Sequence, residues 1–274
     1  MLTLNSQGKT LSSSKPLIMG ILNVTPDSFY QKSRVMAVSE AIDQAGKMLD
    51  DGASILDIGG QSTRPGADAI SASEELDRIG VVIEALVKQF PDVFISVDTY
   101  FSEVAKQVVK IGAHIINDIS GGQYDTQMFN TIAALNVPYV VMHVNENKDE
   151  MHSIKTEASI LPVVQDFFTN TITAAHNAGI QQLILDPGFG FSKTPAQNFE
   201  LISHLSSLTS FQKPILIGVS RKSTIYKTLG ITAAEALNGS TVLHTAAILH
   251  GASILRVHDI KEANEVVTLC NYLQ

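Results

Sequence analysis

Charged, amide and hydroxyl side chains recur at the ends of short apolar segments along the whole sequence. The formal net charge is −8, yet arginine and lysine are prominent at these positions, and arginine forks bind phosphate and diphosphate groups well. The pattern predicts a site for a small anionic ligand. The residues concerned are Asn23, Asp98, Asn117, Asp118, His143, Asp186, Ser220, Arg221, Lys222, Arg256 and His258, with Arg64 in a nearby loop.

Two of the carboxylates allow three kinds of chemistry. Asp98 and Asp186 could hold a metal ion, pair with the nearby cations, or accept hydrogen bonds from the amine and ring N–H groups of a ligand. Their spacing alone does not decide among the three.

Three loops that follow apolar segments carry hydroxyl, cationic or aromatic side chains besides the Gly and Pro of ordinary turns. They are Thr25–Phe29, Gln61–Gly66 and Pro187–Phe191. Turn chemistry explains their glycine and proline but not the other groups, so we expect these loops to border the same site.

Eight short, β-branched apolar segments must position these side chains. Continuous rather than alternating apolar runs are typical of strands covered on both faces, as in parallel sheets. The segments are Leu17–Val24, Ser54–Gly60, Val93–Thr99, His114–Ser120, Pro138–Val144, Leu183–Gly188, Ile215–Ser220 and Ser253–Asp259.

Helical patterns separate the predicted strands, and eight such pairs predict a (β/α)8 TIM barrel with its site at the C-terminal ends of the strands. An open doubly wound sheet is the alternative, but the first strand lacks the glycine-rich turn of dinucleotide-binding sheets. Capping boxes predict the starts of three helices. They pair Ser71 with Glu74, Thr194 with Gln197, and Thr232 with Glu235.

The whole chain, residues 1–274, is expected to form a single domain. A short hairpin over residues 1–16 would plug the bottom of the barrel, residues 17–259 would form the barrel core, and residues 260–274 a C-terminal helix.

Composition limits the partners and the compartment. The chain is 45% hydrophobic and 17% charged, which is a globular composition, and its acidic balance without a Lys/Arg block disfavours nucleic acid and anionic membranes. The single cysteine, Cys270, excludes an intrachain disulfide and suits a reducing cytoplasm. No run approaches about 18 apolar residues, and the first residues lack the pattern of a signal peptide. We expect a soluble cytoplasmic protein with no membrane or nucleic-acid partner.

Seven segments, taken in order, resemble the signature segments of the dihydropteroate synthase family. They touch seven of the eight predicted strand ends, and the resemblance covers nearly the whole chain. The segments are MGILNVTPDSF (Met19–Phe29), DIGGQSTRPGA (Asp57–Ala67), SVDT (Ser96–Thr99), NDISGG (Asn117–Gly122), DPGFGF (Asp186–Phe191), SRKS (Ser220–Ser223) and RVHD (Arg256–Asp259).

The resemblance implies a TIM-barrel transferase of folate biosynthesis. Such an enzyme joins (7,8-dihydropterin-6-yl)methyl diphosphate to 4-aminobenzoate, releases diphosphate, uses Mg²⁺ and is a sulfonamide target. It also implies a homodimer, with which the apolar helix over Thr232–His250 is compatible.

The same resemblance implies how the pterin and the aminobenzoate are bound. Asp186 would accept from the donor edge of the pterin, Asn117 would give and take hydrogen bonds, and Lys222 would donate to the pterin carbonyl and ring nitrogen. The slot for 4-aminobenzoate would be shaped by Phe29, Thr63, Pro65, Phe191 and Ser223.

On the diphosphate side, the resemblance implies a grip by Arg64, Arg256 and His258, and it makes Asn23 the Mg²⁺ ligand. The Arg256 guanidinium could also lie over the pterin plane.

The reaction would proceed by loss of diphosphate ahead of attack by the arylamine, leaving a cationic pterin that Asp98 stabilises. Asp98, Lys222 and Arg256 are the implied catalytic residues.

Three departures from the family pattern concern loops. Gln61 stands where the family usually has Glu, Tyr30–Ser33 replaces a Ser-Asp-Gly-Gly stretch, and MHVNENKDEMH (Met142–His152) replaces Met-His-Met-Gln-Gly. We expect them to affect metal affinity and loop order more than the reaction. Two other functions stay open. One is a methyltetrahydrofolate:corrinoid methyltransferase of the same barrel type, which the SRKS, STRPG and RVHD segments disfavour because it needs no diphosphate grip. The other, suggested by Gln61 and the missing carboxylate after Phe29, is a pterin-binding relative without catalysis.

Several polar residues have a structural interpretation. Asp57 and Asp118 lie inside apolar segments and are expected to be hydrogen-bond acceptors of the scaffold, and His143 to orient its loop. The role of His152 is left open. The remaining histidines are expected to be structural: His114, His176, His204, His244 and His250.

Overall fold

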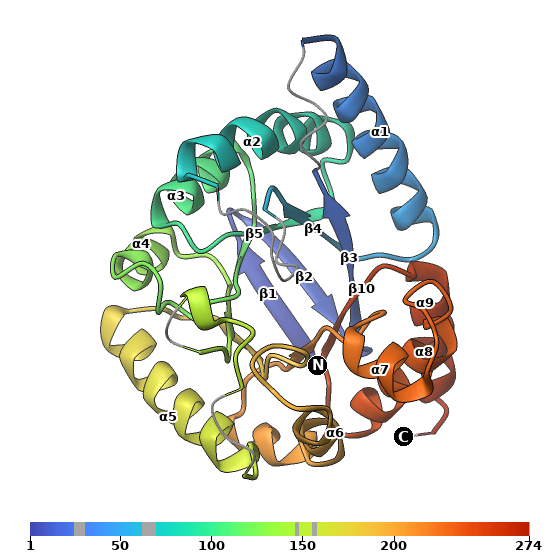
Figure 1. Cartoon of the computed structure of the whole chain (residues 1–274). Coiled ribbons are helices and arrows are strands. Elements are labelled where there is room, and N and C mark those ends of the chain that lie inside the picture. The colour runs from blue at the N-terminus through green and yellow to red at the C-terminus, as the bar shows by residue number, and fades with distance from the viewer. Residues whose placement is uncertain (25–30, 62–69, 146–147, 155–157, 274) are drawn as a thin grey trace.

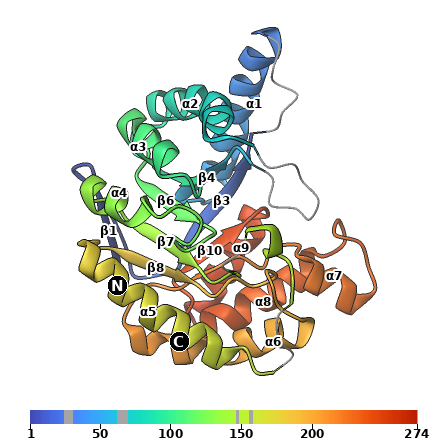
Figure 2. The same ribbon diagram turned by 60° about the vertical axis from the view of Figure 1, so that its left-hand side comes forward.

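The predicted apolar segments form the parallel strands of a barrel with helices around it (Figures 1 and 2). The computed structural model describes residues 1–24, 31–61, 70–145, 148–154 and 158–273. The barrel strands are β3 (Leu17–Asn23), β4 (Ile55–Gly59), β5 (Phe94–Asp98), β6 (Ile115–Asp118), β7 (Tyr139–Met142), β8 (Leu183–Asp186), β9 (Leu216–Ile217) and β10 (Ile254–Val257).

The sheet closes on itself, which decides between the two predicted architectures. Its order is β8-β7-β6-β5-β4-β3-β10-β9, with every neighbouring pair parallel. A parallel bridge between Leu185 and Ile215 then joins β8 to the segment that leads into β9. The prediction of a (β/α)8 barrel is therefore confirmed, and the open doubly wound sheet is excluded.

Helices follow the strands along the chain and surround the barrel (Figure 1). In the described part of the chain, none is both long and apolar enough to cross a bilayer. They are α1 (Gln31–Asp50), α2 (Ala72–Gln89), α3 (Ser102–Ile111), α4 (Met128–Leu135), α5 (Leu161–Ala178), α6 (Pro195–Ser203), α7 (Ser223–Leu229), α8 (Leu237–Leu249) and α9 (Ile260–Cys270), with 3-10 turns η2 (Lys148–Glu150) and η3 (Leu205–Phe211).

Two of the three predicted capping boxes start helices as expected. Ser71 and Glu74 cap α2, and Thr194 and Gln197 cap α6. The third prediction is wrong about the helix. Thr232 does donate to the Glu235 carboxylate, but residues 233–236 form a turn and α8 begins at Leu237.

The turn before α8 has an identifiable cause in the Arg221 guanidinium. Its Nη1 donates to the carbonyl oxygens of Ala233 and Ala234. Those carbonyls face a side chain from another loop instead of continuing an α-helical hydrogen-bond ladder, so the helix starts one turn later than the sequence predicts.

The strand predicted over Ile215–Ser220 is shorter than expected, because the chain leaves the sheet after Ile217. The Lys222 backbone N–H donates to the Val219 carbonyl at 3.1 Å, which closes a turn, and Arg221 adopts a φ of 52°. The early exit brings Ser220 beside the end of β10.

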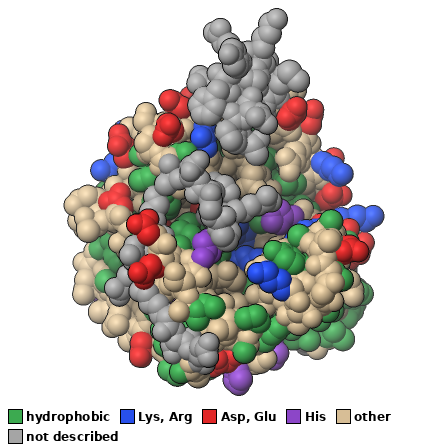
Figure 3. Space-filling model, viewed as in Figure 1, with side chains coloured by type: hydrophobic (Ala, Val, Ile, Leu, Met, Phe, Trp, Pro, Cys, Tyr) green, Lys and Arg blue, Asp and Glu red, His purple; other side chains and the backbone are tan. Residues whose placement is uncertain are grey.

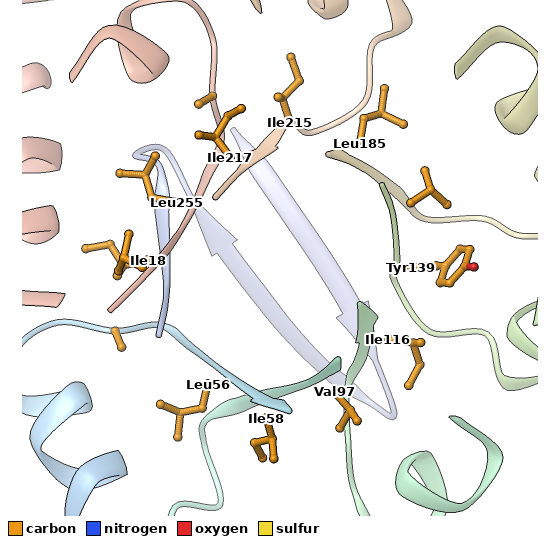
Figure 4. Packing of buried hydrophobic residues seen from close by; sticks show 14 of the residues in the cluster. Ile18, Leu56, Ile58, Val97, Ile116, Tyr139, Leu185, Ile215, Ile217 and Leu255 are labelled. Carbon is orange, nitrogen blue, oxygen red and sulfur yellow. The ribbon is translucent and has the colours of Figure 1, made fainter. Parts of the chain in front are cut away.

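Side chains alternate along each strand between two apolar layers. One set faces the helices and forms the larger core, and Figure 4 shows its members ringing the barrel, among them Ile18, Leu56 and Leu255. The other set points into the barrel and forms a second cluster at its lower end. That cluster contains Leu17, Met19, Ile55, Phe94, Ile115, Val140, Ile184, Leu216 and Ile254.

An N-terminal hairpin covers the lower end of the barrel, as predicted. Strands β1 (Leu2–Ser6) and β2 (Lys9–Ser13) pair antiparallel, and they lie across the ring of strands in Figure 4. Leu4, only 2% exposed, packs into the inner apolar cluster. Because apolar side chains fill the bottom of the barrel, polar chemistry is confined to its upper part.

His244, on α8, predicts a pH dependence of stability. The side chain is buried and its Nε2 has no hydrogen-bond partner among the described residues, and burial lowers its pKa from 6.5 to about 4. Below about pH 6.5 the unfolded chain binds a proton that the folded chain does not, so this group makes stability fall as the pH drops toward 4. We expect His244→Leu to remove about 2 to 3 kcal/mol of that loss.

Urea unfolding at pH 7.5, 6.0 and 4.5 measures this effect. His176→Leu, at an exposed position of α5, is the matched control and should follow the wild type. Parallel losses of stability in His244→Leu and in the wild type over this range would contradict the assignment.

Candidate active site

A set of polar side chains points into the barrel above the apolar cluster that fills its lower end. Because successive side chains of a strand point to opposite faces, residues two or four positions after a member of this cluster also point inward. Strand register aligns them further, since Asp98 pairs with Gly59 on one side and with Asn117 on the other. The inner set consists of Asn23, Asp57, Asp98, Asn117, Asp186 and Arg256.

Arg256 joins two of the carboxylates. Its Nε donates to Asp57 Oδ2 at 2.6 Å, and its Nη2 donates to Asp98 Oδ2 at 2.9 Å. Asp57 is completely buried, whereas the side chains of Arg256 and Asp98 are 21% and 13% exposed. The guanidinium is therefore fixed at its base by Asp57 while its edge reaches the open part of the barrel.

Asp57 also fixes Asn117, whose Nδ2 donates to Asp57 Oδ2 at 3.1 Å. Burial raises the pKa of Asp98 to about 7, and the charge of Arg256 opposes this rise. Asp57 was expected to be a hydrogen-bond acceptor of the scaffold, and its acceptor oxygen serves two residues of the predicted site.

A second group of polar residues, formed by Asp186 and Lys222, lies beside Arg256 on the barrel wall, because β9 alone separates β8 from β10. Burial raises the pKa of Asp186, and Oδ1 of this residue accepts from the Gly188 N–H at 2.8 Å. Lys222 donates to the Phe189 carbonyl, and its Nζ lies 4.5 Å from the centre of the Phe191 ring. Burial lowers the pKa of Lys222 to about 8, and the charge of Asp186 opposes this shift.

The segments that follow β9 and β10 meet at the rim of the barrel beside Arg256 and Lys222. The backbone N–H of His258 donates to Ser220 Oγ at 3.2 Å, and its Nδ1 lies 3.2 Å from the same oxygen. Ser223 is half-buried as the first residue of α7. Figure 3 shows Lys, Arg and His side chains near the centre of this face.

One predicted cation does not join the site. Arg221 was expected at the rim, but its guanidinium forms an ion pair with Asp259 at 2.8 Å and binds the turn before α8. The Arg221 charge therefore stabilises the turn before α8 and not a ligand. Four further predicted residues lie outside the described part of the chain: Phe29, Thr63, Arg64 and Pro65.

Other polar residues take the structural roles expected of them. Asp118 faces outward and accepts from Tyr139 Oη at 2.5 Å, from Ser120 Oγ at 2.6 Å and from the Gly122 N–H. His114 Nδ1 accepts from the Ile95 N–H. His152, whose role was left open, stacks on Phe191 with ring centres 5.7 Å apart.

Sequence reasoning missed two buried polar residues beside the site, Lys193 and Asn198. Lys193 donates to three backbone carbonyls, and Asn198 Oδ1 accepts from the Gly190 N–H at 2.6 Å. The only signal was their position, immediately before and within the helix that follows the DPGFGF segment.

A magnesium ion would find one neutral protein ligand here. Asn23 is exposed at the end of β3, and a Cβ placed on Gly59 would lie 3.6 Å from its Oδ1 and 4.0 Å from Asp98 Oδ2. Within the described ranges, no three His, Cys, Asp or Glu side chains form a metal cluster. A hard amide oxygen on an exposed side chain fits an ion held mostly by substrate phosphate and water.

Comparison with known proteins identifies the family. A model of the pterin-binding enzymes matches residues 19–258. The dihydropteroate synthase of Escherichia coli K12 is 40% identical over 264 residues, which cover 96% of this chain and 93% of that protein. The chain belongs to the dihydropteroate synthase family.

Solved structures agree with this membership. The Yersinia pestis dihydropteroate synthase, solved with a sulfonamide drug, has a TM-score of 0.91, 39% identity and coverage of 99% of this chain and 98% of its own. The Xanthomonas albilineans enzyme, solved with 4-aminobenzoic acid, has a TM-score of 0.90, 37% identity and coverage of 99% and 98%. The chain is thus a transferase of this family, and the corrinoid methyltransferase alternative is not supported.

Proposed function

We propose that the inner residues of the barrel mouth carry out the family reaction, the condensation of (7,8-dihydropterin-6-yl)methyl diphosphate with 4-aminobenzoate. The observation that carries this assignment is the Arg256 fork, held by buried Asp57 and touching Asp98, beside a carboxylate and a lysine at Asp186 and Lys222. One flat ligand with a donor edge and an anionic tail would match both halves.

The pterin would lie with its donor edge toward Asp186. The carboxylate is almost completely buried, so a ring N–H and an exocyclic amine would supply hydrogen bonds that water cannot. Asn117, held through its Nδ2 by Asp57, keeps its amide in one orientation toward the same ligand. Lys222 would donate to the pterin carbonyl.

Cleavage of the C–O bond sends its electron pair to the diphosphate and leaves positive charge on the pterin. Arg256 and His258 would stabilise the departing anion, and Asp98 would stabilise the cation. The neutral arylamine then attacks the methylene carbon, forms the C–N bond and loses one proton to the released diphosphate or to solvent. No strong base is required, because the amine carries a free electron pair at neutral pH.

Asn23 would hold the magnesium ion of the family, together with phosphate oxygens and water. When bound, the ion would neutralise part of the diphosphate charge. Asn23 would thereby orient the diphosphate toward Arg256, on the neighbouring strand β10, and toward His258, directly after that strand.

The aminobenzoate would bind above the pterin, against Phe191 and Ser223 and against Phe29, Thr63 and Pro65. Support comes from the relatives solved with 4-aminobenzoic acid and with a sulfonamide drug, both of which are aromatic amines. A sulfonamide is accordingly expected to compete with 4-aminobenzoate in this chain.

We also propose that the chain is a homodimer of the cytoplasm. Val242 and Leu249 are exposed apolar residues of α8, a helix that is compatible with the homodimer implied by the family resemblance. The single cysteine, Cys270, is free and buried, as suits a reducing compartment.

A product assay tests the proposal. Purified protein would receive the dihydropterin diphosphate, 4-aminobenzoate and Mg²⁺, with dihydropteroate quantified by chromatography. We expect product that requires 4-aminobenzoate and that decreases when a sulfonamide is added. Folded protein that binds the dihydropterin diphosphate without forming product would instead identify a non-catalytic relative, and Gln31 and Gln61 would be the first residues to replace.

A further inference from the structure

Lys193 is a buried lysine whose ammonium group binds the backbone of two loops. Its side chain is 7% exposed, and Nζ donates to the carbonyl oxygens of His143 at 3.3 Å, Gly188 at 3.0 Å and Phe191 at 3.1 Å. His143 follows β7, whereas Gly188 and Phe191 belong to the loop that follows β8. One side chain therefore ties two neighbouring loops of the barrel mouth together.

The two loops approach each other closely at this point. Gly188 has a φ of 71°, and a Cβ on it would lie 2.0 Å from the His143 carbonyl oxygen and 3.1 Å from Lys193 Nζ. Only glycine allows this approach. The carbonyl groups brought together there are buried acceptors, and the lysine supplies donors to all three.

Burial of the Lys193 ammonium group costs desolvation free energy. The side chain is therefore expected to do more than fill space. Burial lowers the pKa of Lys193 to about 7, and only the charge of Asp186 counteracts this effect, while the charge of Lys222 adds to it. A methionine would fill similar space without desolvating a charge.

The loop held by Lys193 carries Phe191, one wall of the proposed aminobenzoate slot. Phe191 is stacked on one side by His152 and lies 4.5 Å from Lys222 Nζ. Asp186 depends less on the lysine, because it is a strand residue whose carbonyl accepts from the His143 N–H at 2.9 Å in the β7–β8 ladder.

We propose that Lys193 is a positioning residue that fixes the Phe191 wall of the aminobenzoate slot by holding the backbone of its loop. It acts on the second substrate more than on the pterin. This inference rests on the proposed function, because it assigns a role within the same site.

Lys193→Met tests the inference through the separation of two binding constants. We expect the KM for 4-aminobenzoate to rise about tenfold or more, because the slot wall loses its fixed geometry. The Kd of the dihydropterin diphosphate, measured by calorimetry without 4-aminobenzoate, should change less than about threefold. Lys193→Arg, which keeps the charge and several donors, should recover part of the KM.

Lys110→Met is the matched control, since Lys110 is exposed in the last turn of α3 at the opposite end of the barrel from the mouth. It should leave both constants unchanged. Lys193→Gln, with a neutral polar head, repeats the test and serves if Lys193→Met does not fold. The same selective rise in KM is expected from it.

The outcomes separate the two proposals. A wild type that forms no dihydropteroate would remove the proposed function. An active wild type would overturn the inference about Lys193 if Lys193→Met and Lys193→Gln kept the KM for 4-aminobenzoate. The inference would also be overturned if both substrates weakened equally, because a general loss of structure predicts that result.

Discussion

Arg256→Gln is expected to reduce dihydropteroate formation by about a thousandfold or more and to destabilise the fold. Arg256 is the described side chain that contacts both the buried acceptor Asp57 and the mouth carboxylate Asp98. Loss of a preorganised donor to a departing anion costs two to three orders of magnitude, and loss of an arginine that stabilises phosphate charge can cost about 10³ to 10⁵.

The stability cost has a separate origin. Without the guanidinium, Asp57 is left as a fully buried charge, and among the described residues only Asn117 donates to it. Removing one partner of a buried ion pair costs about 3 kcal/mol or more. The partial exposure of Arg256 and Asp98 reduces the contribution of their contact through solvent screening.

A double mutant separates these two effects. Arg256→Gln combined with Asp57→Asn removes both buried charges, so we expect most of the free energy of unfolding to return while activity stays low. Arg256→Lys keeps a charge but not the fork, and should lie between the wild type and Arg256→Gln. Urea unfolding and the product assay measure the two quantities. Activity of Arg256→Gln within tenfold of the wild type would refute the assignment.

The position of this arginine could be predicted because strand geometry is regular. Residues at the C-terminal ends of parallel strands converge at one end of a barrel, and alternation decides which of them point inward. Asp98 and Asp186 end their strands as predicted, and both face the interior. Continuous apolar runs gave the strand positions to within about two residues in most cases.

Loop geometry could not be predicted in the same way. Arg221 and Lys222 are adjacent in the sequence, yet a turn with a positive φ at Arg221 sends the first to Asp259 and the second to Phe189. Lys193 was missed because its partners are backbone carbonyls, and these leave no trace in residue types. The shortened strand β9 depends on the same turn, which sequence periodicity does not encode.

Asp186→Asn is expected to weaken binding of the dihydropterin diphosphate by about 2 to 3 kcal/mol, or about 30- to 150-fold in Kd. The asparagine oxygen can still accept from the Gly188 N–H, as Asp186 Oδ1 does at 2.8 Å. Its amide nitrogen then faces a ligand edge that carries donors, so a favourable contact becomes an unsatisfied one.

Stability should change in the opposite direction. Burial raises the pKa of Asp186, so its charged form is less favourable in the folded chain than in the unfolded chain at pH 7, and removing the charge should not lower the free energy of unfolding. Calorimetry with the dihydropterin diphosphate and urea unfolding measure the two effects, with Asp166→Asn on the exposed face of α5 as the control. Unchanged pterin binding in a folded Asp186→Asn protein would remove the pterin from this side of the barrel. Weaker binding together with equal or higher stability would show that the buried carboxylate is retained for its ligand, at a cost to the fold.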